Sequence, residues 1–307
     1  MLKEKALRRI FIATVAIFVV LTIYSIVNIE NDTQVFKDAY YIKERDKNVI
    51  YSLNKDNYIA RATVYIDIKL PLEEKVKSLL EIMTSKNNKN ALLPSYFKPI
   101  LPVGTQIKKV EFDNNILKVT FNNALINITK EQSEKMLEAI IYTLTEFEEV
   151  HGIELYIDNK LLKYAPNTKV KLPVFLDRNF GVNKVYNIDS LSDINKVFLY
   201  YISTYEDNTY YIPVTKYVNG TKEKLEIIVE ELSNNYIYEK NLSSYLDTNL
   251  KLDNYFIQDK TIKMIFKDSN EEIREEAINT LSLSIFDNYD INKVIIVIND
   301  KVIEKLK

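Results

Sequence analysis

Residues 153–162 have the sequence IELYIDNKLL, and residues 294–303 have the sequence VIIVINDKVI. Both stretches combine strand-forming residues with a turn of Asn and Asp. Three further pairs of segments recur in the same order: KVKSLLEIM at 75–83 with KLEIIVEEL at 224–232, LKVTF at 117–121 with IKMIF at 262–266, and YTLT at 142–145 with NTLS at 279–282. Because their spacing is far longer than the roughly 20–50 residues of a solenoid unit, the matches indicate a duplicated domain.

Each copy has the same predicted order of elements, β-β-α-β-β-α-β. Apolar residues of both helices fall on one stripe, and the hairpin of the first copy turns at residues 113–115, Asp-Asn-Asn. The sequence therefore predicts an α+β fold in which two helices pack on one face of a β-sheet. The predicted boundaries are 48–165 for the first copy, 166–195 for a linker and 196–307 for the second copy.

A membrane anchor is predicted at residues 10–29, IFIATVAIFVVLTIYSIVNI, which hold no charged side chain. Twenty helical residues cross a hydrocarbon core of about 30 Å. The basic segment 1–9 precedes this stretch, so the positive-inside rule places the N-terminus in the cytoplasm and the bulk of the chain outside. Residues 30–47 are predicted to form a stalk. A cleaved signal peptide is the alternative, but its apolar region is usually shorter and ends in a small-x-small site.

Composition excludes several classes of protein. The chain has no cysteine, so disulfides, thiolate metal sites and a lipoprotein anchor are excluded. The net charge is −2, of which residues 1–9 contribute +3, so the other residues sum to −5. We therefore expect no nucleic-acid partner.

Motifs of catalysis are missing from the sequence, which has no G-x-G-x-x-G, P-loop or G-x-S-x-G. The single histidine, His151, is followed by Gly152 at a predicted helix-to-strand junction and is interpreted as a turn residue. Glu146, Glu148 and Glu149 cluster at a helix end, but the sequence cannot show whether two carboxylates face each other across a cleft, as in a glycosidase. We expect no enzyme activity, no cofactor and no metal site.

A predicted hairpin of the second copy is rich in tyrosine, at positions 200, 201, 205, 210 and 211. Strand propensity explains such a composition. A surface that stacks on glycans is the functional alternative.

The outward positions of the last predicted strand differ between the copies. They are Glu154 and Tyr156 in the first copy but Ile295 and Val297 in the second. An apolar outer face has to be covered. Ile295 and Val297 therefore pack against the other domain or the C-terminal residues, or they form an interface with a partner.

Two short motifs stand out in the first copy. Leu101, Pro102, Gly104 and Thr105 form an L-P-x-G-T turn, and a T-L-T-x-F helix end is formed by Thr143, Leu144, Thr145 and Phe147. In both motifs the first copy resembles the GerMN domain. These residues also have structural interpretations, because Gly104 suits a turn and Leu144 and Phe147 suit a core. The second copy keeps a T-L-S segment at 280–282 but lacks the L-P-x-G-T turn. A transmembrane segment without cysteine is a further departure, since the well-known member looks like a lipoprotein.

The resemblance implies a fold similar to ring-building motifs and a role in the assembly that joins mother cell and forespore. The leading hypothesis is a membrane-anchored extracytoplasmic scaffold that acts in sporulation or envelope assembly through contacts with other extracytoplasmic proteins. Its oligomeric state, homo- or hetero-oligomer, stays open. The alternative hypothesis is a protein that binds or remodels peptidoglycan. A sensor is disfavoured because only residues 1–9 are expected in the cytoplasm.

Overall fold

The computed structural model describes residues 45–307, except 68, 207, 235, 238–241, 247, 268–272 and 300. The predicted basic segment, anchor and most of the stalk lie outside the described residues. Within the described part, every helix is too short or too polar to span a bilayer. The described residues from Lys47 onwards form one compact unit, which holds both copies of the repeat.

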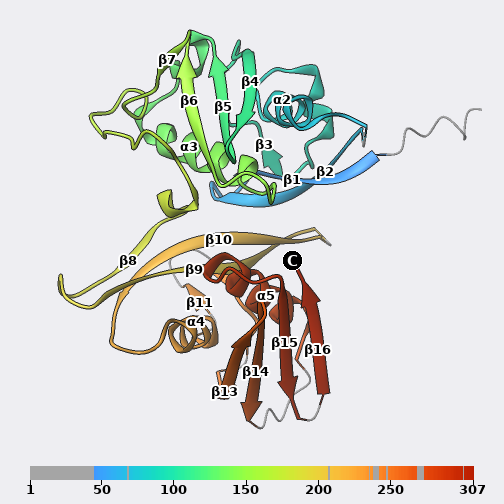
Figure 1. Cartoon of the computed structure of the whole chain (residues 1–307), viewed down its shortest axis with the longest axis vertical. Helices are drawn as coiled ribbons and strands as arrows, with labels where there is room; N and C mark the ends of the chain where they lie inside the picture. The colour runs from blue at the N-terminus through green and yellow to red at the C-terminus, as the bar shows by residue number, and fades with distance from the viewer. Residues whose placement is uncertain are drawn as a thin grey trace, which may run out of the picture. The chain divides into compact units, whose positions relative to one another are not determined.

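The first copy follows the predicted order and adds one strand at its end (Figure 1). Its main strands and helices are β1 (Arg45–Asn54), β2 (Ile59–Asp67), α2 (Leu72–Ile82), β4 (Ile107–Asp113), β5 (Ile116–Phe121), α3 (Lys130–Leu144), β6 (Gly152–Ile157) and β7 (Lys160–Leu161). Its short elements are β3 (Phe97–Lys98) and two 3-10 helices, Asn88–Leu92 and Asn123–Ile126. Because β1 begins at Arg45, the last residues of the range predicted as stalk belong to this strand.

The second copy repeats that order. Its main elements are β9 (Ile194–Tyr205), β10 (Asn208–Asn219), α4 (Lys224–Ser233), β13 (Lys251–Gln258), β14 (Thr261–Lys267), α5 (Glu275–Asn288), β15 (Lys293–Ile298) and β16 (Lys301–Leu306). Two short strands, β11 (Tyr236–Ile237) and β12 (Leu242–Ser243), extend its first sheet. The expected α+β class and the recurrence of the element order are confirmed.

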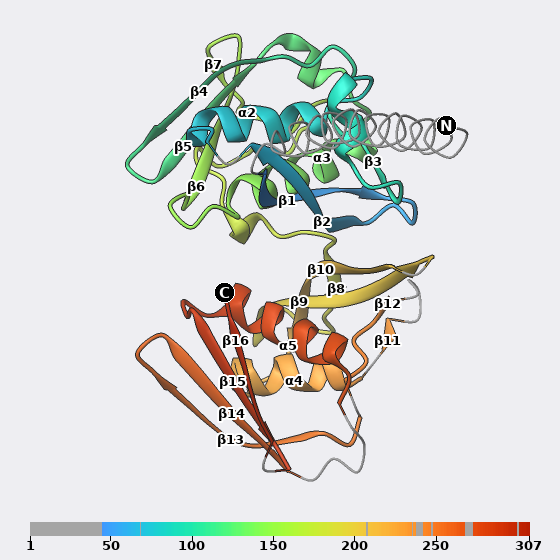
Figure 2. The ribbon, with the colours of Figure 1, turned by 90° about the vertical axis from the view of Figure 1, so that its right-hand side faces the viewer.

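The expectation of one sheet per copy is wrong, because each copy has two. The first copy has sheets β2-β1-β3 and β4-β5-β6-β7, and the second has β11-β12-β9-β10-β8 and β13-β14-β15-β16. In the second copy, α4 and α5 lie between the two sheets and contact strands of both (Figure 2). The physical reason is visible in α3, where every residue from Met136 to Leu144 is buried. A helix buried all round has to be covered on two sides.

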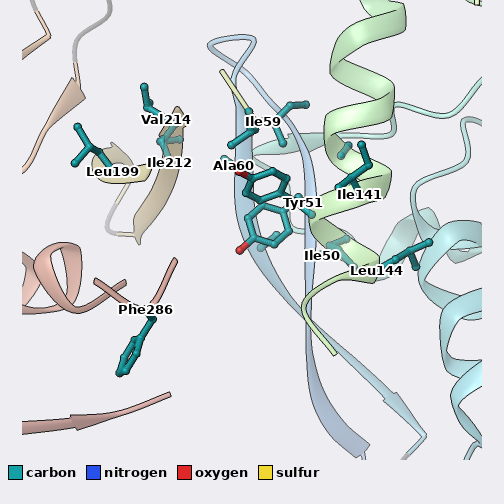
Figure 3. Packing of buried hydrophobic residues seen from close by; sticks show 14 of the residues in the cluster. Ile50, Tyr51, Ile59, Ala60, Ile141, Leu144, Leu199, Ile212, Val214 and Phe286 are labelled. Carbon is teal, nitrogen blue, oxygen red and sulfur yellow. The ribbon is translucent and has the colours of Figure 1, made fainter. Parts of the chain in front are cut away.

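The four-stranded sheets share one pairing pattern. Strand β5 pairs in parallel with β6 across the connection through α3, and β14 pairs in parallel with β15 across α5. The outer strands of both sheets pair antiparallel. On the other side of α3, Ile50 and Tyr51 of β1 lie beside Ile141 and Leu144 of the helix, and all four are fully buried (Figure 3).

The segment predicted as a linker is part of the folded structure. It contains the 3-10 helix η3 (Arg178–Phe180) and strand β8 (Val185–Asn187), which pairs in parallel with β10. Residues 170–175 form no strand in the described structure. Isolated bridges stand there instead, joining Tyr164 to Lys171 and Ile153 to Leu176.

Candidate functional site

Equivalent tyrosines of the two copies hold equivalent places. The backbone N–H of Tyr51 in β1 donates to Thr143 Oγ1 of α3 at 2.8 Å, and that of Tyr200 in β9 donates to Ser284 Oγ of α5 at 2.8 Å. The counterpart of Thr143 is therefore Ser284, one helical turn beyond Thr280, to which the sequence match assigned it. Ser284 lies one turn before the end of α5 at Asn288, whereas Thr143 is next to the last residue of α3, Leu144.

The side chains of these tyrosines meet where the copies join. The hydroxyl oxygens of Tyr51 and Tyr200 are 3.2 Å apart. Tyr51 donates its proton to Glu146 Oε2 at 3.1 Å, and Tyr200 donates to Asp287 Oδ2 at 2.9 Å. Glu146 lies three residues after Thr143, and Asp287 lies three residues after Ser284. The same arrangement of tyrosine, hydroxyl and acid therefore occurs in both copies, and the two arrangements are in contact.

Two arginines neutralise the two acids. Arg178, from the linker, donates through Nη1 to both oxygens of Asp287 at 2.7 Å and through Nη2 to Glu146 Oε2 at 2.5 Å. Its Nε donates to Thr145 Oγ1 at 3.2 Å. Arg61 of β2 donates through Nη2 to the other oxygen of Glu146 at 3.0 Å. The fork geometry of a guanidinium suits such paired acceptors. We call Tyr51, Arg61, Glu146, Arg178, Tyr200 and Asp287 the junction cluster.

Burial and the two arginines shift the pKa values of Tyr51, Tyr200 and Glu146. Burial, together with the charge of Glu146, raises the pKa of Tyr51 to about 12, and burial and Asp287 raise that of Tyr200 well above its usual value. Burial alone would raise the pKa of Glu146, but Arg178 and Arg61 outweigh it and lower that pKa. General acid-base catalysis requires a pKa near the working pH. The two carboxylates and the two arginines of the cluster form a network of ion pairs.

A cavity of about 590 Å³ opens beside the cluster. Its walls include His151 and Phe147 as well as the acids Glu146 and Asp287. Both of these carboxylates are already bonded to Arg178. No group of three His, Asp or Glu side chains in the described ranges is placed to hold a metal ion.

A second contact between the copies uses the tyrosine-rich hairpin. The ring of Tyr96 stacks between Tyr205 and Tyr210, with centroid distances of 4.9 and 4.6 Å. Its hydroxyl also lies 2.7 Å from Ser203 Oγ. Of the other predicted tyrosines, 200 and 201 are buried, and the hydroxyl of 211 accepts a hydrogen bond from Asn279.

A third contact is made by Asn183 of the linker, whose φ is 45°. Its Oδ1 accepts from the N–H of Ile59 at 3.0 Å, and its Nδ2 donates to the carbonyls of Ile59 and Pro213 at 2.7 and 2.8 Å. The backbone N–H of Asn183 donates to Glu138 Oε2 at 3.1 Å. One amide thus joins β2 of the first copy to β10 of the second.

The residues of the family motif have structural places. Leu101, Thr143 and Leu144 are fully buried, and Gly104 has φ +81°, which suits glycine. The N–H of Thr105 donates to the carbonyl of Pro102 at 3.2 Å and closes the turn. Thr145 and Phe147 line the cavity beside the junction cluster.

Sequence reasoning missed the arginines and the tyrosine pair. Arg61 and Arg178 are two of only six arginines in a chain rich in lysine. Arginine is favoured over lysine as the partner of buried, paired carboxylates. The rarity of arginine in this chain was therefore the signal that could have pointed to Arg61 and Arg178.

The candidate interface lies on the outer face of the sheet β13–β16. Ile295 pairs with Lys263 and Glu304 of the neighbouring strands, and Val297 pairs with Ile265 and Val302. Both are half-buried.

The outer face of the first copy is more polar at the matching strand. Glu154 pairs with Lys118, and Tyr156 pairs with Thr120 and Leu161. The contrast expected from the sequence is therefore present between the two sheets.

The fold and these contacts define a two-domain repeat protein whose copies meet at the junction cluster, at the Tyr96 stack and at Asn183. Residues 39–163 match the model of the Germane family, described as "Sporulation and spore germination". The first copy matches this family, and the whole chain is similar to proteins with two GerMN domains in tandem.

Comparisons with the sequence and the solved structure of one relative cover most of the chain. The chain is 25% identical over 264 residues to the spore germination protein GerM of Bacillus subtilis (strain 168), covering 82% of this chain and 71% of that protein. Its fold is similar to the solved structure of the tandem GerMN domains of the sporulation protein GerM from Bacillus subtilis. That match has a TM-score of 0.77 and 24% identity and covers 84% of this chain and 92% of the other.

Proposed function

We propose that the chain is a membrane-anchored extracytoplasmic scaffold that acts in sporulation through contacts with other proteins. The relation to a spore germination protein supports the process. The junction cluster carries the mechanism, because a scaffold has to hold its two binding modules in a fixed relation. An anchor at residues 10–29 would hold that pair of domains against the membrane.

The charged groups at the junction support a structural role over a chemical one. Glu146 and Asp287 are both bonded to Arg178, and the hydroxyls of Tyr51 and Tyr200 donate to these acids. Reactive groups of an enzyme have to be free to meet a substrate. The proposed role is therefore non-enzymatic.

The alternative function, peptidoglycan binding, receives less support from the tyrosines. Stacking on a glycan needs an exposed ring face. Tyr205 and Tyr210 stack on Tyr96 instead, and Tyr200 and Tyr201 are buried.

The outer face of the second sheet is the proposed contact surface for a partner. A photo-crosslinking residue at 295 or 297, in cells forming spores, is expected to trap another extracytoplasmic protein. The matched controls are positions 154 and 156 on the more polar face of the first copy. Equal crosslinking from positions 295 and 297 and from positions 154 and 156 would show that Ile295 and Val297 do not form a specific contact surface.

Two controls make the test decisive. Ile295→Lys should weaken trapping while leaving the circular dichroism spectrum and melting temperature close to those of the parent, because Ile295 is only half-buried. Incubation of the purified protein with peptidoglycan should release no muropeptides. Their release would replace the scaffold by the wall-remodelling alternative.

A further inference from the structure

A basic hairpin stands out in an acidic chain. Residues 159–176 hold Lys160, Lys163, Lys169 and Lys171 and no aspartate or glutamate, whereas the chain after residue 9 sums to −5. Such a local excess of one sign marks a surface that attracts the opposite charge.

The hairpin is held in one shape by its own bonds. The N–H of Leu172 donates to the carbonyl of Lys163, and the N–H of Ala165 donates to that of Val170, both at 2.9 Å. At the tip, Asn167 Nδ2 donates to the carbonyls of Ile126 and Ile128 at 3.0 and 2.5 Å. The cations are therefore presented by an ordered element. We call residues 160–172 the basic hairpin.

The lysines of the basic hairpin are available to a ligand. All four are exposed, and none of them forms an ion pair within the described ranges of the chain. Lys184 and Lys216 behave differently, since they are largely covered and paired with Glu138 and Glu231.

Apolar side chains lie among these cations. Tyr164 is 53% exposed and Val170 is 61% exposed, while Ala165 and Leu172 are buried beneath them. Cations together with protruding apolar side chains are typical of a surface that settles into lipid headgroups.

A cavity of about 750 Å³ lies between the basic hairpin and the start of α3. Lys130, Lys169 and Lys184 contribute its cations, and Ala165, Val170 and Phe180 contribute apolar walls. Glu134 also lines it but is bonded to Lys184, and Glu131 stands in the first turn of α3. The cavity is of the size that takes a small ligand, and its lining suits a headgroup phosphate with the start of its acyl chains.

We propose that the basic hairpin docks on the anionic headgroups of the bilayer in which residues 10–29 anchor the chain. This inference rests on the membrane anchoring of the proposed function. Residues 30–44 could reach at most about 50 Å, and such a tether gives weak contacts a high effective concentration. Lipid is favoured over an acidic protein because Tyr164 and Val170 protrude beside the lysines.

The test uses the full chain in nanodiscs. Hydrogen exchange of residues 160–172 is compared between discs with phosphatidylglycerol and discs of phosphatidylcholine alone. Slower exchange is expected only with the anionic lipid. The triple variant Lys163→Gln, Lys169→Gln, Lys171→Gln should lose this protection by about tenfold or more.

A matched triple variant serves as the control. Lys98→Gln, Lys108→Gln, Lys109→Gln removes the same charge from exposed positions of the first copy and should keep the protection. The docking proposal is overturned if residues 160–172 exchange equally fast in the two kinds of disc. It is also overturned if both triple variants lose the same amount of protection. Either result leaves the anchored function untouched. Failure of the chain to insert into discs would overturn the anchored function and the docking with it. Binding of the inserted chain to a soluble acidic peptide, without lipid-dependent protection, would assign the hairpin to a protein partner.

Discussion

The hydroxyl of Tyr51 lies 3.2 Å from the hydroxyl of Tyr200, and the two residues occupy the same place in their own copies. Each donates to an acid of its own copy, and Arg178 joins the two acids. Duplicated domains connected by a chain have no need to touch at equivalent residues. Here they do touch, and Arg178 of the linker bonds to the acids of both copies and so connects the pair.

Arg178→Ala is expected to destabilise the protein by about 2–4 kcal/mol, because it leaves two largely buried carboxylates with less compensation. Urea unfolding measures this change. Lys260→Ala is the control, since its ion pair with Asp290 is exposed. That pair should contribute no more than about 0.5 kcal/mol. Equal effects of the two substitutions would show that Arg178 has no special role.

The junction should weaken in acid. Because the pKa of Glu146 is lowered in the folded state, its contribution to stability is present above its ordinary value of 4.5 and is lost as the pH falls through the lowered pKa. Glu146→Gln should therefore be less stable than the parent at pH 7. The difference should shrink below about pH 4 in urea titrations. A constant difference across this range would contradict the ionic role of Glu146.

Tyr96→Leu tests the aromatic contact. Two stacked partners are lost, so we expect a cost of about 2–3 kcal/mol in the free energy of unfolding. The control is Tyr186→Leu, since Tyr186 stacks on Tyr217 at 4.9 Å but is 64% exposed. A similar, small cost for both would mean that the Tyr96 stack contributes little.

Asn183→Ala should cost about 1–3 kcal/mol, because the backbone groups of Ile59 lose their amide partner. Asn183 also has a positive φ, so the backbone conformation itself contributes to the loss of stability in the alanine variant. Asn159→Ala separates the two effects, since Asn159 has φ 68° in an exposed hairpin turn. If calorimetry gives the same loss of stability for both variants, the bridge between β2 and β10 is not a source of stability.

The sequence was sufficient for the features set by local periodicity. The duplicated order of elements, the buried Leu144 and the left-handed turn at Gly104 all follow from short patterns. The second sheet of each copy could not be predicted, because an apolar stripe indicates that a helix is covered but not on how many sides. Arg178 and Asp287 are 109 positions apart, and no periodicity connects such a pair.

The register of the second copy shows a further limit of sequence matching. Matching T-L-T with T-L-S aligned Thr143 with Thr280, but the residue that accepts the hydrogen bond from the equivalent strand is Ser284. A helix repeats its face at each turn, so a shift by one turn preserves the apolar pattern. The contact of Ser284 with β9 and the position of Asp287 three residues later distinguish the two alignments.

The most direct test of the junction is the distance between the two copies. The chain has no cysteine, so spin labels at Lys109→Cys and Lys263→Cys, both exposed, mark one position in each copy without background. Pulsed electron spin resonance of the full chain should give one narrow distance distribution, which broadens when Arg178→Ala is added. A broad distribution in the parent chain, or a narrow one unchanged by Arg178→Ala, would contradict the fastening of the copies by the junction cluster.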